Sequence, residues 1–106
     1  MVYFVGAGPG AADLITVRGM RLLEQADVVI YAGSLVNPEL LSYCKKECEI
    51  HNSAYMTLEE VLAVMEEAEK QKLTTVRLHT GEPSIYGAVR EQMDLLDEKG
   101  ILYESC

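Results

Sequence analysis

Two glycine-containing segments carry the residue types and spacing with which this sequence could bind a small molecule. Residues 6–10 (GAGPG) and residues 79–87 (HTGEPSIYG) each follow an apolar run and lead toward a predicted helix. In a parallel α/β sheet, the loops that leave the carboxyl ends of the strands gather at one edge, where ligands bind. We therefore expect the two segments to meet around one small molecule.

The first segment contains three glycines and one proline within five residues. Glycine adopts positive φ angles at little cost, so a single glycine would be enough for a tight turn. The density of glycine here exceeds that need. Close approach of the backbone to a ligand, or to a second loop, is the interpretation that we favour.

Residues 6–11 formally match the dinucleotide-binding fingerprint, which accepts alanine at its third position. That fingerprint needs a helix that starts within the loop and faces a pyrophosphate. Here Pro9 removes one amide, and the predicted helix cap, Thr16, comes several residues later. The acidic residue expected at the carboxyl end of the second strand is also missing, since Asp27 stands at its amino end. These features disfavour NAD, and the absence of a Gly-Lys-Ser/Thr sequence after the loop disfavours a P-loop.

Strand-like and helix-like segments alternate along the chain and must position these loops. The predicted strands are 2–5, 28–31, 47–51 (weaker, at an edge), 74–79 and 101–104, and the predicted helices are 17–26, a short one from Pro38, 57–72 and 84–99. This alternation predicts one three-layer α/β domain with a mostly parallel sheet of about five strands and helical crossovers.

Local signals define where these helices begin and end. Thr16 is a predicted N-cap, Asn37 precedes a proline at a first helical position, and Thr57 with Glu60 has the spacing of a capping box. Gly100 is placed to end the last helix. Two helices show apolar residues at helical spacing: Leu58, Val61, Leu62 and Met65 in one, and Ile85, Val89, Met93 and Leu96 in the other.

Composition narrows the classes of function. A chain of 106 residues with 49% hydrophobic residues suits one globular domain with one core. No apolar run approaches the about 18–20 residues of a membrane span, and the first residues lack the basic region of a signal peptide, so we expect a cytoplasmic protein. The net charge of −8 argues against a nucleic-acid partner. Cys44, Cys48 and Cys106 lack paired CxxC spacing and are interpreted as free thiols, so no metal site is predicted.

Three ordered motifs resemble the tetrapyrrole methylases, the S-adenosylmethionine-dependent methyltransferases of cobalamin and sirohaem synthesis. They are residues 5–19, residues 26–36 and residues 79–87. The YAGSLV and HTGEPSIYG versions are most similar to the members that methylate precorrin-4 or cobalt-precorrin-4 at C11. Members of the family are longer and have two α/β domains, so the resemblance identifies residues 1–106 as the N-terminal domain, with the C-terminal domain absent.

The resemblance implies that the methyl donor, S-adenosylmethionine, lies in the cleft between the two domains. On the donor side it implies Pro9, Thr80, Gly81, Glu82 and Ile85. The candidates for the substrate side are Gly8, Gly10, Tyr31, Gly33, Ser34 and Tyr86. The other donor contacts would belong to the absent half, so we expect this fragment to be inactive alone.

The implied reaction requires few acidic or basic side chains. Methyl transfer from a sulfonium needs mainly positioning of the nucleophile, here an electron-rich tetrapyrrole carbon. Many relatives have Asp where this chain has Glu82, and other branches have an acidic residue near Gly33, so no catalytic base is assigned. His79, Tyr31 and Tyr86 are candidates for proton transfer, although a packing role is the more ordinary explanation for each.

The implied partners are a tetrapyrrole substrate and, at full length, a second copy of the chain in a homodimer, with neither nucleic acid nor membrane. Three alternatives remain open at this point. One is a non-enzymatic nucleotide- or cofactor-binding α/β module. Another is a different tetrapyrrole methylase, such as a uroporphyrinogen-III or precorrin-2 methyltransferase. The third, an NAD-dependent oxidoreductase fragment, is disfavoured by the missing ribose-binding acid.

Overall fold

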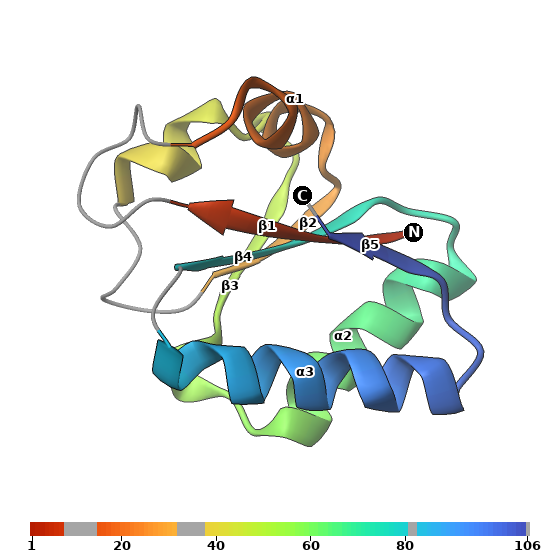
Figure 1. The fold of residues 1–106 in the computed structure, drawn as a ribbon. Helices are drawn as coiled ribbons and strands as arrows, with labels where there is room; N and C mark the ends of the chain where they lie inside the picture. Colours follow the sequence, from red (N-terminus) through yellow and green to blue (C-terminus); the bar gives the residue numbers. More distant parts are fainter. Residues whose placement is uncertain (8–14, 32–37, 81–82, 106) are drawn as a thin grey trace.

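A computed structural model describes residues 1–7, 15–31, 38–80 and 83–105, with the backbone alone for Ala7, Pro38, Thr80 and residues 83–86 (Figure 1). The strands of this part are β1 (Val2–Ala7), β2 (Val28–Tyr31), β3 (Glu49–Asn52), β4 (Thr75–Thr80) and β5 (Tyr103–Ser105). The α-helices are α1 (Val17–Gln25), α2 (Leu58–Lys70) and α3 (Pro83–Glu98), and two 3-10 helices are η3 (Pro38–Tyr43) and η4 (Ser53–Tyr55). Among these described helices, none is long and apolar enough to cross a membrane.

The five described strands form one sheet in the order β3-β2-β4-β1-β5, and every strand pairing is parallel. The predicted three-layer α/β fold with a parallel sheet of about five strands is therefore confirmed. The predicted weak edge strand is β3, which pairs on one side with β2. The other edge strand is β5, next to β1.

Helices cover both faces of the sheet, and each face has its own apolar core. In Figure 1, α1 lies on one face and α2 and α3 lie together on the other. The core on the α1 face includes Val5, Leu23, Val29, Leu40, Val76 and Leu78. The core on the α2 and α3 face includes Phe4, Ile30, Val61, Met65, Val89 and Leu96. The strands are thus apolar on both faces, as expected of a covered parallel sheet.

The predicted helix signals are present in the structure. The Thr16 hydroxyl accepts a hydrogen bond from the Gly19 amide at 3.0 Å and caps α1. Thr57 and Glu60 form a reciprocal capping box at the start of α2, with bonds of 2.9 and 3.2 Å. Gly100 has φ of 71°, the left-handed conformation that ends α3.

A glycine inside α1 lets this helix approach the sheet closely. A Cβ atom built on Gly19 would lie 2.8 Å from Cγ1 of Val5, which is fully buried in β1. Real Cβ atoms essentially never come so close to a neighbour. Gly19 therefore sets the distance between α1 and β1, the strand from which the first glycine segment leaves.

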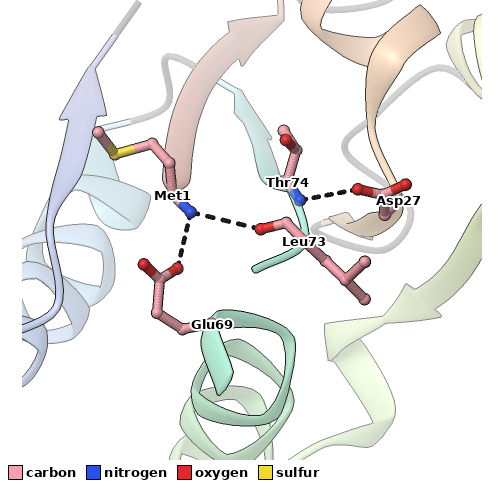
Figure 2. Close-up of polar contacts among 5 residues, drawn as sticks. All are labelled: Met1, Asp27, Glu69, Leu73 and Thr74. Carbon is pink, nitrogen blue, oxygen red and sulfur yellow. Dashed lines mark hydrogen bonds and ion pairs between the residues drawn. The ribbon is translucent and has the colours of Figure 1, made fainter. Parts of the chain in front are cut away.

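The amino ends of the central strands are joined by polar contacts, which Figure 2 shows. The Met1 amino group pairs with Glu69 of α2 at 2.7 Å and donates to the Leu73 carbonyl at 3.3 Å. The Thr74 amide, just before β4, donates to Asp27 Oδ2 at 2.9 Å, just before β2. Residues from three chain segments are thereby held together at the edge opposite to the two glycine segments.

Asp27 also pairs with Lys45, whose Nζ is 2.6 Å from Oδ1. The hydrogen bond from Lys45, followed by the one from the Thr74 amide, lowers the pKa of Asp27 below its usual value of 3.8. The same carboxylate raises the pKa of Lys45. Asp27 is therefore a structural anion at the amino end of the sheet, which agrees with its place at the wrong end of the strand for binding a ribose.

Candidate functional site at the carboxyl edge of the sheet

The two glycine segments leave from neighbouring strand ends. In the register of β1 with β4, Ala7 stands opposite Thr80. The chain leaves β1 toward α1 on one face of the sheet and leaves β4 toward α3 on the other face (Figure 1). Where two adjacent strands send their connections to opposite faces, the loops diverge and a ligand-binding crevice forms between them. The strand ends that lead into the two segments are therefore neighbours, and the meeting of the segments around a ligand stays a prediction.

The structure places only part of the predicted site. Tyr31 ends β2, Thr80 ends β4, and Ile85 and Tyr86 lie in the first turn of α3. The other candidates fall outside the described residues: Gly8, Pro9, Gly10, Gly33, Ser34, Gly81 and Glu82. Tyr31, Thr80 and the start of α3 therefore share one edge, with the direct donor contacts left as predictions.

A hydrogen bond joins the ends of two strands at this edge. The Ser53 hydroxyl, in η4 after β3, donates to the Tyr31 carbonyl at the end of β2, at 3.0 Å. Asn52 caps the same short helix by accepting a bond from the Ala54 amide at 2.9 Å. These bonds fix the turn after β3 against the end of β2.

His79, a candidate for proton transfer, is buried near the end of β4 and stands opposite Gly6 in the register. A buried position in the sheet fits the packing role better than contact with a solvent-borne substrate. Tyr31 is only half-buried.

Arg77 is a polar residue of this region that the sequence analysis missed. It lies in the middle of β4 and is 5% exposed. Its Nε donates to Gln92 Oε1 of α3 at 3.1 Å, and its Nη1 donates to the carbonyls of Ile30 and Leu78, both at 3.3 Å. Burial lowers the pKa of Arg77 to about 10, so the guanidinium stays charged at neutral pH.

The described residues enclose two cavities of note. One, of about 230 Å³, lies between η4, the start of α2, and α3, with Arg77 and Gln92 in its wall. The larger, of about 570 Å³, lies between β3 and α2 and is lined by Asp27, Lys45 and Glu67. Because Asp27 precedes β2, the larger cavity belongs to the amino side of the sheet and not to the crevice. No group of three or more metal-binding side chains occurs in the part of the chain that the structure describes.

The chain matches the model of a known protein family. The model of the family described as Tetrapyrrole (Corrin/Porphyrin) Methylases matches residues 1–105. The chain belongs to this family. The resemblance carried by the three motifs is therefore confirmed.

Two individual relatives are similar to nearly the whole of this chain. The chain is 59% identical over 100 residues to a cobalt-precorrin-4 C(11)-methyltransferase of Methanocaldococcus jannaschii, covering 94% of this chain and 39% of the relative. It is 47% identical to a precorrin-4 C(11)-methyltransferase of Rhodococcus erythropolis, covering 97% of this chain and 41% of the relative. The chain therefore spans about two fifths of the length of these curated relatives.

Solved structures agree in fold. A cobalt precorrin-4 methyltransferase matches with a TM-score of 0.90 and 47% identity, over 98% of this chain and 44% of that one. A uroporphyrin-III C-methyltransferase from Thermus thermophilus, complexed with S-adenosylhomocysteine, matches with a TM-score of 0.77 and 31% identity, over 99% of this chain and 43% of that one.

Proposed function

We propose that this chain is the donor-binding N-terminal domain of an S-adenosylmethionine-dependent methyltransferase that methylates precorrin-4 or cobalt-precorrin-4 at C11. The observation that carries the proposal is the pairing of Ala7 with Thr80 where β1 and β4 end side by side, with the helices that follow them, α1 and α3, on opposite faces of the sheet. The substrate follows from 59% identity to a relative of that name, against 42% for a uroporphyrinogen-III C-methyltransferase of Bacillus subtilis.

The neighbouring ends of β1 and β4, each followed by a glycine-containing segment, suit a donor held largely through backbone groups. We assign the donor contacts to Pro9, Thr80, Gly81, Glu82 and Ile85, and the substrate side to Gly8, Gly10, Tyr31, Gly33, Ser34 and Tyr86. One of the structural relatives is complexed with S-adenosylhomocysteine, the product of such a donor, which supports this ligand class. The second wall of the cleft would come from a C-terminal domain.

When bound, the donor supplies an electrophilic methyl group on a sulfonium. The part played by this chain is to hold that group in line with a nucleophilic ring carbon, because displacement depends mainly on position. Rigid strand ends suit this task, and the Ser53–Tyr31 bond is one source of that rigidity. We expect the full-length enzyme to act as a homodimer in the cytoplasm.

The proposal can be tested with a two-domain chimera, in which residues 1–105 are followed by the remaining length of the Methanocaldococcus relative. Incubated with cobalt-precorrin-4 and a donor carrying a ¹³C-methyl group, the chimera should transfer the label to C11, as read by NMR. Methylation of uroporphyrinogen-III in preference would assign the chain to another branch of the family. Binding of the donor without transfer to any tetrapyrrole would favour a non-enzymatic cofactor-binding module.

Calorimetry tests the shared cleft separately. S-adenosylhomocysteine should bind the chimera stoichiometrically and should bind the 106-residue chain far more weakly, because one wall of the cleft is then missing. Equally tight binding to the 106-residue chain would contradict a donor site shared between two domains.

A further inference from the structure

The cavity of about 230 Å³ beside Arg77 combines a buried cation with open space. Among the residues that the structure describes, no carboxylate forms an ion pair with Arg77, and its hydrogen bonds to them all go to neutral oxygens of Gln92, Ile30 and Leu78. A buried charge is normally paired, because neutral acceptors offset only part of the free energy lost on leaving water. Arg77 thus lies in the cavity wall without an ion pair to any described carboxylate.

The remainder of the wall suits a ligand with one negative charge and an apolar body. Met56, Leu58 and Val61 contribute apolar surface. Glu91 lines the same cavity and is exposed, so it disfavours ligands with several negative charges more than it disfavours a monoanion. The volume far exceeds the about 10–15 Å³ that one water needs, so the cavity has room for a small organic acid group.

The cavity is also well placed in the fold. Ser53 in its wall follows the carboxyl end of β3 and is bonded to the end of β2. Ala88 in its wall lies in the second turn of α3, which starts just after β4. The cavity therefore adjoins the carboxyl edge on the α2 and α3 face, apart from the residues assigned to the donor.

We propose that this cavity is a carboxylate-binding site in which the Arg77 guanidinium, held by Gln92, receives the ligand's carboxylate. A planar guanidinium matches a carboxylate in shape and forms charge-assisted hydrogen bonds with it. The carboxylate comes either from an acid side arm of a tetrapyrrole or from a small free acid. The first source rests on the proposed function, whereas the site itself does not.

The direct test follows the Nε–H resonance of Arg77 in the 106-residue chain by ¹H–¹⁵N NMR during titration with sodium acetate. Sodium chloride and sodium phosphate at matched ionic strength serve as comparisons. We expect a saturable shift with acetate that chloride and phosphate do not produce. A response to acetate no larger than the response to chloride would overturn the proposal.

Variants separate the roles of the two charges, with Gln92 side-chain resonances as the reporter. Arg77→Lys keeps the charge but loses the planar donor group, and it should weaken acetate binding about tenfold. Glu91→Gln removes the negative charge from the cavity wall and should strengthen acetate binding about twofold to fivefold. Arg90→Lys, an exposed residue of the same helix, is the matched control and should leave binding unchanged.

If Arg77→Lys fails to fold, the wild-type titration and Glu91→Gln still decide the question. If Arg77→Lys and Glu91→Gln both fold and bind acetate with unchanged affinity, the proposed carboxylate-binding site would be contradicted. A second titration with uroporphyrin, a tetrapyrrole with carboxylate arms, distinguishes the sources. A shift of the Arg77 resonance at lower concentration than with acetate supports the side arm, and a response to acetate alone supports a small free acid, even if methyl transfer by the chimera fails.

Discussion

The two edges of the sheet differ in what their polar residues do. At the amino edge, Asp27 is bound by Lys45 and by the Thr74 amide, and Glu69 is bound by the Met1 amino group. At the carboxyl edge, Ala7 and Thr80 end neighbouring strands, and the helices that follow these strands, α1 and α3, lie on opposite faces of the sheet. The charges of the first edge neutralise one another, whereas near the second edge a buried guanidinium forms no ion pair with a described residue.

This difference suggests that the two edges have different roles. Polar groups at the amino edge join chain segments and stabilise the fold, so their loss should change stability and leave ligand binding alone. In open parallel sheets, the carboxyl edge is where ligands bind, so changes there should affect affinity.

The largest expected effect comes from the core that both edges share. Leu78 in β4 is fully buried, and Leu78→Ala removes apolar contacts and leaves a cavity. We expect the free energy of unfolding to fall by about 2–5 kcal/mol, measured by urea denaturation. The exposed Leu102 is the matched control, and Leu102→Ala should change stability by no more than about 0.5 kcal/mol. Equal effects of the two substitutions on stability would contradict the placement of Leu78 in the buried core.

Asp27→Asn tests the amino edge. It removes an ion pair with Lys45 and weakens the bond from the Thr74 amide, and the site is partly open to water. We expect a loss of about 1–2 kcal/mol in unfolding free energy, with the affinity of the chimera for S-adenosylhomocysteine unchanged. Asp94→Asn, at a more exposed pair with Arg90, should change stability less. A large drop in ligand affinity for Asp27→Asn would contradict this difference in roles.

The pH dependence of the same residue gives a second test. The pKa of Asp27 is lower in the folded chain than its usual value of 3.8, because Lys45 and the Thr74 amide bind the ionised form. Its stabilisation is therefore complete above that value and is lost as the pH falls through the lower folded pKa. The stability difference between wild type and Asp27→Asn should shrink in acid below pH 3.8 and stay constant above about pH 5. A difference that grew on acidification would have the wrong sign.

The smallest effect is expected at the capping box of α2. Thr57→Ala removes the hydroxyl that accepts from the Glu60 amide. We expect a loss of about 1 kcal/mol in unfolding free energy, and Thr57→Ser should restore most of it because serine caps equally well. If serine were no better than alanine, the capping bond would not be the cause.

Much of the fold could be predicted because local patterns and packing agree. The apolar stripe with Val61, Leu62 and Met65 predicts the buried face of α2, and all three are buried. The capping box defines where this helix begins, and Gly100 defines where α3 ends, since each acts through its own backbone neighbours. That the strands leading into the two glycine segments end at the same edge was also predictable, because parallel strands share one loop edge.

Other features depend on contacts between distant residues and have no local signal. Nothing near Gly19 in the sequence indicates that Val5 would lie against it. Arg77 interrupts a β-branched run, and only the packing of α3 brings Gln92 within hydrogen-bond distance. Asp27 meets Lys45 and Thr74 only once β2 and β4 are paired. Such pairings are decided by the tertiary fold.

We propose that the carboxyl edge between β1 and β4 binds the methyl donor. Backbone amide shifts of the ¹⁵N-labelled chain, followed during titration with S-adenosylhomocysteine, show where the ligand binds, since weak binding still gives shifts. The largest shifts should fall at Ala7 and Thr80 and at the start of α3, with small ones at Val2 and Thr75 at the other ends of the same strands. Shifts concentrated at Val2 and Thr75, or around Asp27, would contradict it.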